Sequence, residues 1–120
     1  MTPAAPRSEA ATQARLWYWQ RISAMVLTLC VFVHLGVIIY AVRGGLSGAE
    51  ILGRTQGSWL FGGFYVLFVL ACAVHVPIGF GNIVREWGGL SAEQSRLASW
   101  LLGLVILVMG LRSVYAVVLA

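Results

Sequence analysis

The sequence predicts an all-α membrane protein with three transmembrane helices, its N-terminus in the cytoplasm and its C-terminus outside. Three observations predict this class. Of the 120 residues, 60% are hydrophobic and only 10% are charged, whereas roughly a quarter of the residues in globular domains are charged. The apolar residues form three segments, each longer than the roughly 20 residues needed to cross a bilayer. Aromatic residues and single arginines lie at the segment ends, as is typical of helices anchored at membrane interfaces.

The N-terminal half of the chain predicts a tail, one helix and a loop. Residues 1–14 are polar and rich in Ala, Pro and Ser, so we expect a flexible cytoplasmic tail before a three-helix transmembrane domain at 15–120. The first helix is expected at about 16–42, with aromatic residues at both ends. This length exceeds one span and indicates tilt or an interfacial start. The glycine-rich loop at 43–57 follows, with a short interfacial turn at about 50–52.

The remaining helices are bounded by local signals. The second helix is expected at about 58–84. Trp87 closes this apolar segment, and the Gly-Gly pair after it is the signal that stops the helix. Ser91, with Gln94 three residues later, forms a capping-box pattern that starts the third helix, expected at about 92–118. No internal repeat is visible, and three helices cannot form two inverted halves, which weighs against a complete transporter.

The arginines predict the orientation and exclude one class of partner. The net charge of +4 comes from eight arginines and four glutamates, without lysine or aspartate. Five arginines lie before or at the start of the first helix and around the second loop, against two in the first loop, so the positive-inside rule places the N-terminus in the cytoplasm. Because the arginines are dispersed, we expect no nucleic acid as a partner. Without an obvious presequence, a bacterial inner (cytoplasmic) membrane is the expected location.

His75 lies inside the second apolar segment, where an ionisable side chain is costly and marks a functional site. Ala71, Cys72 and Gly79 share its helix face at spacings of three and four residues. Small residues there leave room for a large planar ring such as haem, and equally for close packing of a neighbouring helix. The residues alone leave three roles open for His75: axial haem ligation, a hydrogen bond to another helix, and a proton relay. No CxxCH motif occurs, which excludes a covalently attached haem.

His34 is the second intramembrane histidine, and it follows Arg21 on the first helix much as His75 precedes Trp87 on the second. Counted from these two residues at 1.5 Å per residue, both histidines are expected roughly 18–20 Å from the cytoplasmic edge. One haem shared by the two, a separate haem, or an interhelical hydrogen bond would all agree with this spacing. On a helical wheel, Ser23 shares a face with His34, whereas Arg21 does not. We therefore expect His34 to point away from any site that Arg21 faces.

Two motifs resemble those of a known family. The first helix begins WYWQRISAMVLTL, in which Arg21-Ile-Ser23-Ala is similar to the Arg-x-Ser-Gly motif of the cytochrome b membrane anchor subunit of succinate dehydrogenase and fumarate reductase. The second helix ends HVPIGFGNIVREW, similar to that family's His-x-x-x-Gly-(Ile/Phe)-x-(His/Asn)-x-x-x-(Asp/Glu)-aromatic signature. The separation between Arg21 and His75 along the chain also agrees with the family. The resemblance covers about residues 15–118.

The resemblance implies a haem b-binding anchor that passes electrons from an iron–sulfur subunit to quinone in a succinate:quinone oxidoreductase type complex of the tricarboxylic acid cycle. His75 matches the axial haem ligand, and His34 is the candidate second ligand. The residues implied near quinone or a haem propionate are Arg21, Ser23, Glu86 and Trp87. The implied partners are a second small membrane anchor subunit, an iron–sulfur subunit and a flavoprotein subunit, besides quinone and the lipid bilayer. By itself the chain would not be catalytic.

Three positions depart from the family pattern. Trp17 stands where a quinone-contacting serine is usual, Gln20 where a histidine is usual, and Gly81 where an arginine is usual. Two other functions therefore stay open. One is a haem-free structural anchor of a related membrane dehydrogenase, in which His75 only forms a hydrogen bond. The other is a small transporter subunit.

Overall fold

The computed structural model describes residues 7–119, and in this range it consists of helices joined by short connections. The helices are α1 (Arg7–Gly44), α2 (Gly48–Thr55), α3 (Trp59–Trp87) and α4 (Ala92–Val118). Three of them, α1, α3 and α4, are long and apolar enough to cross a membrane. This confirms an all-helical protein with three candidate spans, while the orientation of the termini stays a prediction.

The first helix begins nine residues before its expected start. The structure therefore differs from the flexible tail that we expected, because residues 7–14 are helical; residues 1–6 of that tail lie outside the described part. Alanine, glutamate, glutamine and arginine are favourable in helices, so a chain rich in them can continue α1 beyond the apolar segment. At 1.5 Å per residue the 38 residues of α1 extend about 57 Å, nearly twice the thickness of a hydrocarbon core.

Capping boxes start two of the helices. At α2, Ser47 Oγ accepts a hydrogen bond from the backbone N–H of Glu50, whose carboxylate accepts one from the N–H of Ser47. The expected turn at this place is thus a helix of two turns. At α4, Ser91 and Gln94 form the same reciprocal pair, which confirms the predicted start of that helix. Gly89, in the connection before α4, has a φ of +65°, a backbone conformation that suits glycine.

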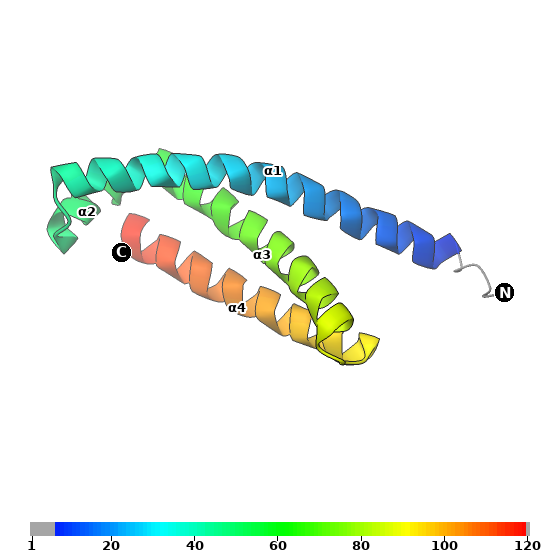
Figure 1. The fold of residues 1–120 in the computed structure, drawn as a ribbon. Coiled ribbons are helices and arrows are strands. Elements are labelled where there is room, and N and C mark those ends of the chain that lie inside the picture. Colours follow the sequence, from blue (N-terminus) through cyan, green and yellow to red (C-terminus); the bar gives the residue numbers. More distant parts are fainter. Residues whose placement is uncertain (1–6, 120) are drawn as a thin grey trace.

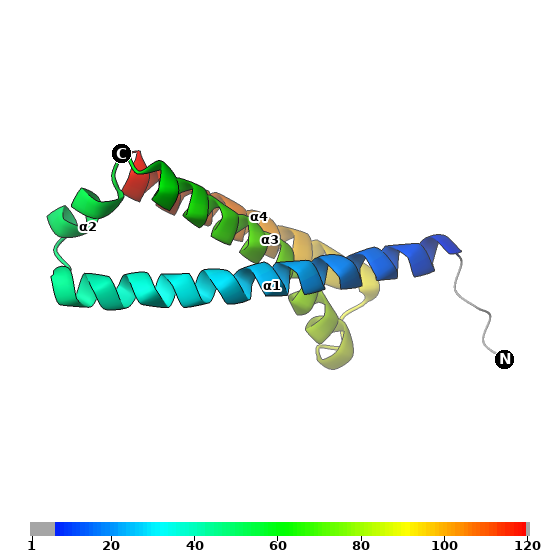
Figure 2. The ribbon, with the colours of Figure 1, turned by 90° about the horizontal axis from the view of Figure 1, so that it is seen from above.

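The long helices are arranged with α3 in the middle (Figures 1 and 2). It packs along α4 and crosses α1, whereas α1 and α4 scarcely touch. The N-terminal end of α1 and the C-terminal end of α4 lie at opposite ends of the molecule (Figure 1). Few side chains are fully buried among the described residues, and many large apolar side chains are exposed. Such surfaces are left for lipid or for another membrane subunit.

Glycines allow α3 and α4 to pack closely. A Cβ added to Gly110 would lie 2.6 Å from Cγ1 of Val69, and one added to Gly103 would lie 2.9 Å from Cγ of Pro77. Small residues at such positions are how membrane helices bring their backbones together without a hydrophobic driving force. The pair α3–α4 is therefore a tight hairpin, and α1 joins it from another side of α3.

Candidate functional site

The described structure brings two of the predicted site residues together across α1 and α3. Nδ1 of His75 lies 3.4 Å from Oγ of Ser23. Ser23 is only 5% exposed, and its hydroxyl also donates to the backbone carbonyl of Gln20 at 3.1 Å. The contact shows that Ser23 faces the second transmembrane helix. It occupies one nitrogen of the imidazole and leaves Nε2 for another partner.

An open groove of about 350 Å³ lies beside this contact. Besides His75, its lining comes from α1: Ala24, Leu27, Thr28, Val31 and Phe32. The one hydroxyl that α1 places in this lining belongs to Thr28, and it donates to the carbonyl of Ala24 at 2.8 Å. The groove is therefore apolar apart from the imidazole. An apolar planar group whose metal takes a nitrogen ligand matches this combination, so the residues present fit one side of a haem b.

His34 has a hydrogen-bond partner within its own chain. Its Nδ1 lies 3.4 Å from the hydroxyl oxygen of Tyr65. The imidazole also stands edge-on to Tyr65 and to Phe68, with ring centroids 5.7 Å and 5.5 Å away and interplanar angles of 88°. These contacts satisfy one imidazole nitrogen at membrane depth and hold the ring between α1 and α3. The sequence reasoning missed Tyr65, although a tyrosine in the middle of an apolar segment generally needs a partner for its hydroxyl.

The two histidines lie at different depths. His75 on α3 is opposite Ser23 on α1. His34 lies about three turns after Ser23 on α1, which is about 16 Å along the helix axis. The side chains opposite His34, Tyr65 and Phe68, precede His75 by ten and seven positions on α3. The expectation of similar depth is therefore wrong, and the contacts give no support to one haem shared by both histidines.

The physical reason is that the residues chosen as markers of the membrane edge are not level with each other. Ser23 follows Arg21 almost directly, yet it is opposite His75, which lies about three helical turns before Trp87. The end of α3 thus continues well past the level of Arg21. The depth of each histidine was counted from a residue taken as the membrane edge on its own helix. Comparing the two depths requires the register between α1 and α3, which only their packing determines.

Arg21 lies on another side of α1 from Ser23. Residues two positions apart on a helix point in nearly opposite directions, and Arg21 is exposed with its guanidinium carbon 5.3 Å from the ring centroid of Trp17. This agrees with the wheel, which separated Arg21 from the face that carries Ser23 and His34. A cation–π pair at an exposed helix surface contributes about 0.5–1 kcal/mol, so this contact holds Arg21 only weakly.

A small residue next to His75 serves helix packing. A Cβ added to Gly79 would lie 3.2 Å from Nε2 of Gln20, and Ala71 on the same face is buried. The side-chain oxygen Oε1 of Gln20 is buried without a hydrogen-bond partner within the described range. Of the two explanations for the small residues, close approach of a neighbouring helix therefore applies to Gly79.

Glu86 and Trp87 lie at the exposed end of α3. Gln20 is opposite Gly79, which precedes Glu86 by two helical turns, or about 10 Å along the helix. Trp87 is 84% exposed. Of the six predicted site residues, only Ser23 and His75 are in contact; the other four lie apart from this pair.

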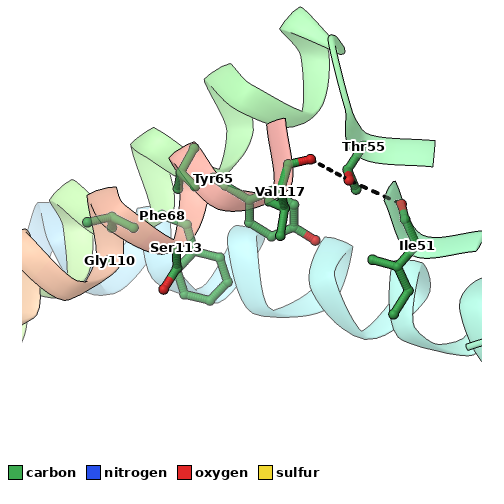
Figure 3. Close-up of a pocket in the computed structure, with 9 residues that line it drawn as sticks. Ile51, Thr55, Tyr65, Phe68, Gly110, Ser113 and Val117 are labelled. Atoms are coloured by element: carbon green, nitrogen blue, oxygen red, sulfur yellow. Dashed lines mark hydrogen bonds between the residues drawn. The ribbon is translucent and has the colours of Figure 1, made fainter. Parts of the chain in front are cut away.

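A second cavity, of about 290 Å³, lies between α2, α3 and α4 (Figure 3). At its edge, Thr55 donates a hydrogen bond to the carbonyl oxygen of Val117 at 2.7 Å. Tyr65 and Phe68 line the cavity from α3. This cavity is thus near the level of His34 rather than His75. No cluster of three or more His, Cys, Asp or Glu side chains able to hold a metal ion occurs among residues 7–119.

One of the comparisons with known proteins gave a match. A family model described as succinate dehydrogenase/fumarate reductase transmembrane subunit matches residues 1–111. No curated protein and no solved structure gave a match. The matched range contains both motifs and the contact between Ser23 and His75. Because it spans nearly the whole chain, this protein belongs to the family of succinate dehydrogenase/fumarate reductase transmembrane subunits.

Proposed function

We propose that this chain is the haem b-binding membrane anchor of a succinate:quinone oxidoreductase type complex and passes electrons from an iron–sulfur subunit to quinone. The observation that carries the proposal is His75, an imidazole at membrane depth with one nitrogen held by Ser23 and an apolar groove beside it. An intramembrane histidine with such surroundings is a functional site by default. Family membership supports the anchor role and the partnership with the other subunits.

His75 would provide Nε2 to the iron, while the aliphatic and aromatic side chains of the groove would cover the apolar macrocycle. When bound, haem supplies a one-electron carrier between the iron–sulfur clusters and quinone. A second imidazole ligand would come from the second small membrane anchor subunit, because His34 lies about 16 Å along α1 from Ser23 and contacts Tyr65. Ligation of a separate haem by His34 would use its Nε2, the nitrogen that Tyr65 leaves free.

Arg21 is the residue of this chain best suited to quinone. It is a permanently charged donor at the start of the apolar part of α1, and it is exposed next to Trp17. A quinone carbonyl would accept from its guanidinium on the side of α1 away from Ser23, with the rest of the pocket supplied by a partner subunit. Glu86 and Trp87, exposed at the end of α3, would then belong to the cytoplasmic surface that meets the iron–sulfur and flavoprotein subunits. In this arrangement the N-terminus would lie in the cytoplasm of a bacterium.

The test is a reduced-minus-oxidised absorption spectrum of the purified complex. Wild type should show a b-type band, and His75→Ala should lose it. His34→Ala is the matched control, since it removes the other intramembrane imidazole, and it should keep the band. Absence of the band from wild type would refute haem binding, and its retention in His75→Ala would assign the ligand to another residue.

A haem-free anchor is the second candidate, and one observation favours it: both imidazoles already have a hydroxyl partner in the same chain. In that protein the two contacts would only join α1 to α3. It predicts that the assembled complex transfers electrons from succinate to quinone without a b-type band. It also predicts that His75→Ala lowers the stability of the assembled complex and leaves its spectrum unchanged.

A further inference from the structure

We propose that Ser23 is a positioning residue for His75: it keeps the imidazole proton on Nδ1 and thereby leaves the lone pair of Nε2 for iron. The inference rests on the proposed function, because the tautomer matters only if the imidazole is a ligand. It goes beyond that function by assigning to Ser23 a role in the electronic state of the haem.

The hydrogen-bond distances indicate which atom donates. A serine hydroxyl has one proton and two lone pairs. Oγ of Ser23 lies 3.1 Å from the carbonyl oxygen of Gln20 and 3.4 Å from Nδ1 of His75. The carbonyl can only accept, so the hydroxyl proton goes to the shorter of the two contacts. Ser23 then presents a lone pair to His75, and Nδ1 must be the donor.

Burial keeps this assignment in place. Ser23 is one of the few buried polar residues of the described chain, so water does not compete for its lone pairs. Thr28 lines the same groove, but its hydroxyl donates to the carbonyl of Ala24. Within the described residues, the hydrogen-bond contact of His75 is therefore with Ser23. The two neutral tautomers of histidine differ in which nitrogen has the lone pair, and the partner of one nitrogen decides the state of the other.

A donor bond from Nδ1 makes the ligating nitrogen more basic. Groups that accept from the free nitrogen of a metal-bound histidine orient the ring and raise its basicity, and their loss typically costs about 10–100-fold in metal affinity or activity. A more basic ligand stabilises the ferric state over the ferrous state. Removal of the acceptor should therefore raise the midpoint potential of the haem. Because the contact is long, we expect the loss of affinity for ferric iron to be at the lower end of this range, about tenfold. With the affinity for ferrous iron unchanged, the ferric-to-ferrous ratio falls by the same factor, which is about 59 mV for one electron.

The test compares Ser23→Ala with Thr12→Val in the purified complex. Ser23→Ala should raise the midpoint potential measured by redox titration and weaken haem retention about tenfold. Thr12→Val removes a hydroxyl that donates within α1 and lies outside the groove, so it should change neither. A purely structural role for Ser23 would not move the potential. An unchanged potential in Ser23→Ala would overturn the inference.

A second measurement needs no variant. In wild type with ¹⁵N-labelled histidine, the reduced-minus-oxidised infrared spectrum should show the Nδ1–H of the ligating histidine as a hydrogen-bonded donor, and a free Nδ1–H would overturn the inference. This also decides the matter if Ser23→Ala does not assemble. A wild-type complex without haem would instead refute the proposed function, which is a different outcome from haem with an unchanged potential.

Discussion

The packing of α3 against α4 makes a quantitative prediction for one glycine. In Gly110→Ala, the new Cβ would lie 2.6 Å and 2.8 Å from the two methyl carbons of Val69. Ordinary contact begins at 3.4 Å, so the helices or the valine must move. Overpacking of this kind costs about 1–3 kcal/mol. Alanine is more favourable than glycine inside a helix by about 0.8–1.0 kcal/mol, so the net loss of stability should be at most about 2 kcal/mol.

Gly36→Ala is the matched control. Gly36 lies within α1 and has nothing within 4 Å of an added Cβ, so this change should bring only the gain in helix propensity, about 1 kcal/mol. Because that gain is common to both variants, their difference isolates the clash and should be about 1–3 kcal/mol. SDS titration of the protein in mild detergent, followed by circular dichroism, measures it. Equal stabilities of the two variants would refute the close approach of α3 and α4 at Val69. Val69→Ala, combined with Gly110→Ala, should restore part of the loss.

Three further changes test the other contacts. Thr55→Val should remove the hydrogen bond to the carbonyl of Val117 and cost about 1 kcal/mol, detected as faster amide hydrogen exchange in α2. A double-mutant cycle with His34→Leu and Tyr65→Phe should give a coupling of about 0.6 kcal/mol in SDS unfolding, the average for interhelical hydrogen bonds in membranes. Hydrogen bonds from Ser47 lower the pKa of Glu50 below its ordinary 4.5. The stability that this adds to α2 is present above pH 4.5 and should be lost as the pH falls through the lowered pKa. Amide hydrogen exchange in α2, followed against pH, measures this loss.

Two of these tests have a control in the chain, and the third is judged by the size of its coupling. Thr12→Val removes an exposed hydroxyl that donates to the carbonyl of Ser8 within the same helix, and it should leave exchange in α2 unchanged. Zero coupling in the cycle would mean that the contact between His34 and Tyr65 does not join the helices. Glu50→Gln should abolish the acid-dependent step in α2, and persistence of that step would assign it to another group.

Features that depend on neighbouring residues were predicted well from the sequence. The start of α4 needs only Ser91 and Gln94 three positions apart. The end of α3, by contrast, was expected at about 84 and lies at Trp87, because the apolar segment ends before the helix does. The start of α1 was not predicted, because the polar composition of residues 7–14 suggests a tail while its alanines favour a helix. In water such a segment is marginal as an isolated helix, but it continues a helix that the membrane segment has already nucleated.

In the candidate site, the contacts between α1 and α3 could not be predicted from the sequence. A helical wheel gave the correct face for Ser23 and separated it from Arg21, because rotation about one helix depends on that helix alone. The pairing of Ser23 with His75 depends on the register between α1 and α3, which is determined by contacts such as Gln20 against Gly79. No spacing within one helix contains that information, and the error in the depth of His34 follows from it.

The packing of α3 against α4 bears on Gly81, where the family usually has an arginine. A Cβ at this position would lie 2.7 Å from Oγ of Ser99 on α4, so a side chain there would point into the packed pair α3–α4. His75 is turned another way, toward Ser23 on α1, because its spacing from Gly81 is not a whole number of helical turns. A side chain at position 81 would have to displace the Ser99 hydroxyl, which donates to the carbonyl of Ser95, and it would start on the face of α3 that packs against α4. Glycine at this position thus leaves the Ser99 hydroxyl undisturbed and gives up the charged group that the family usually has there.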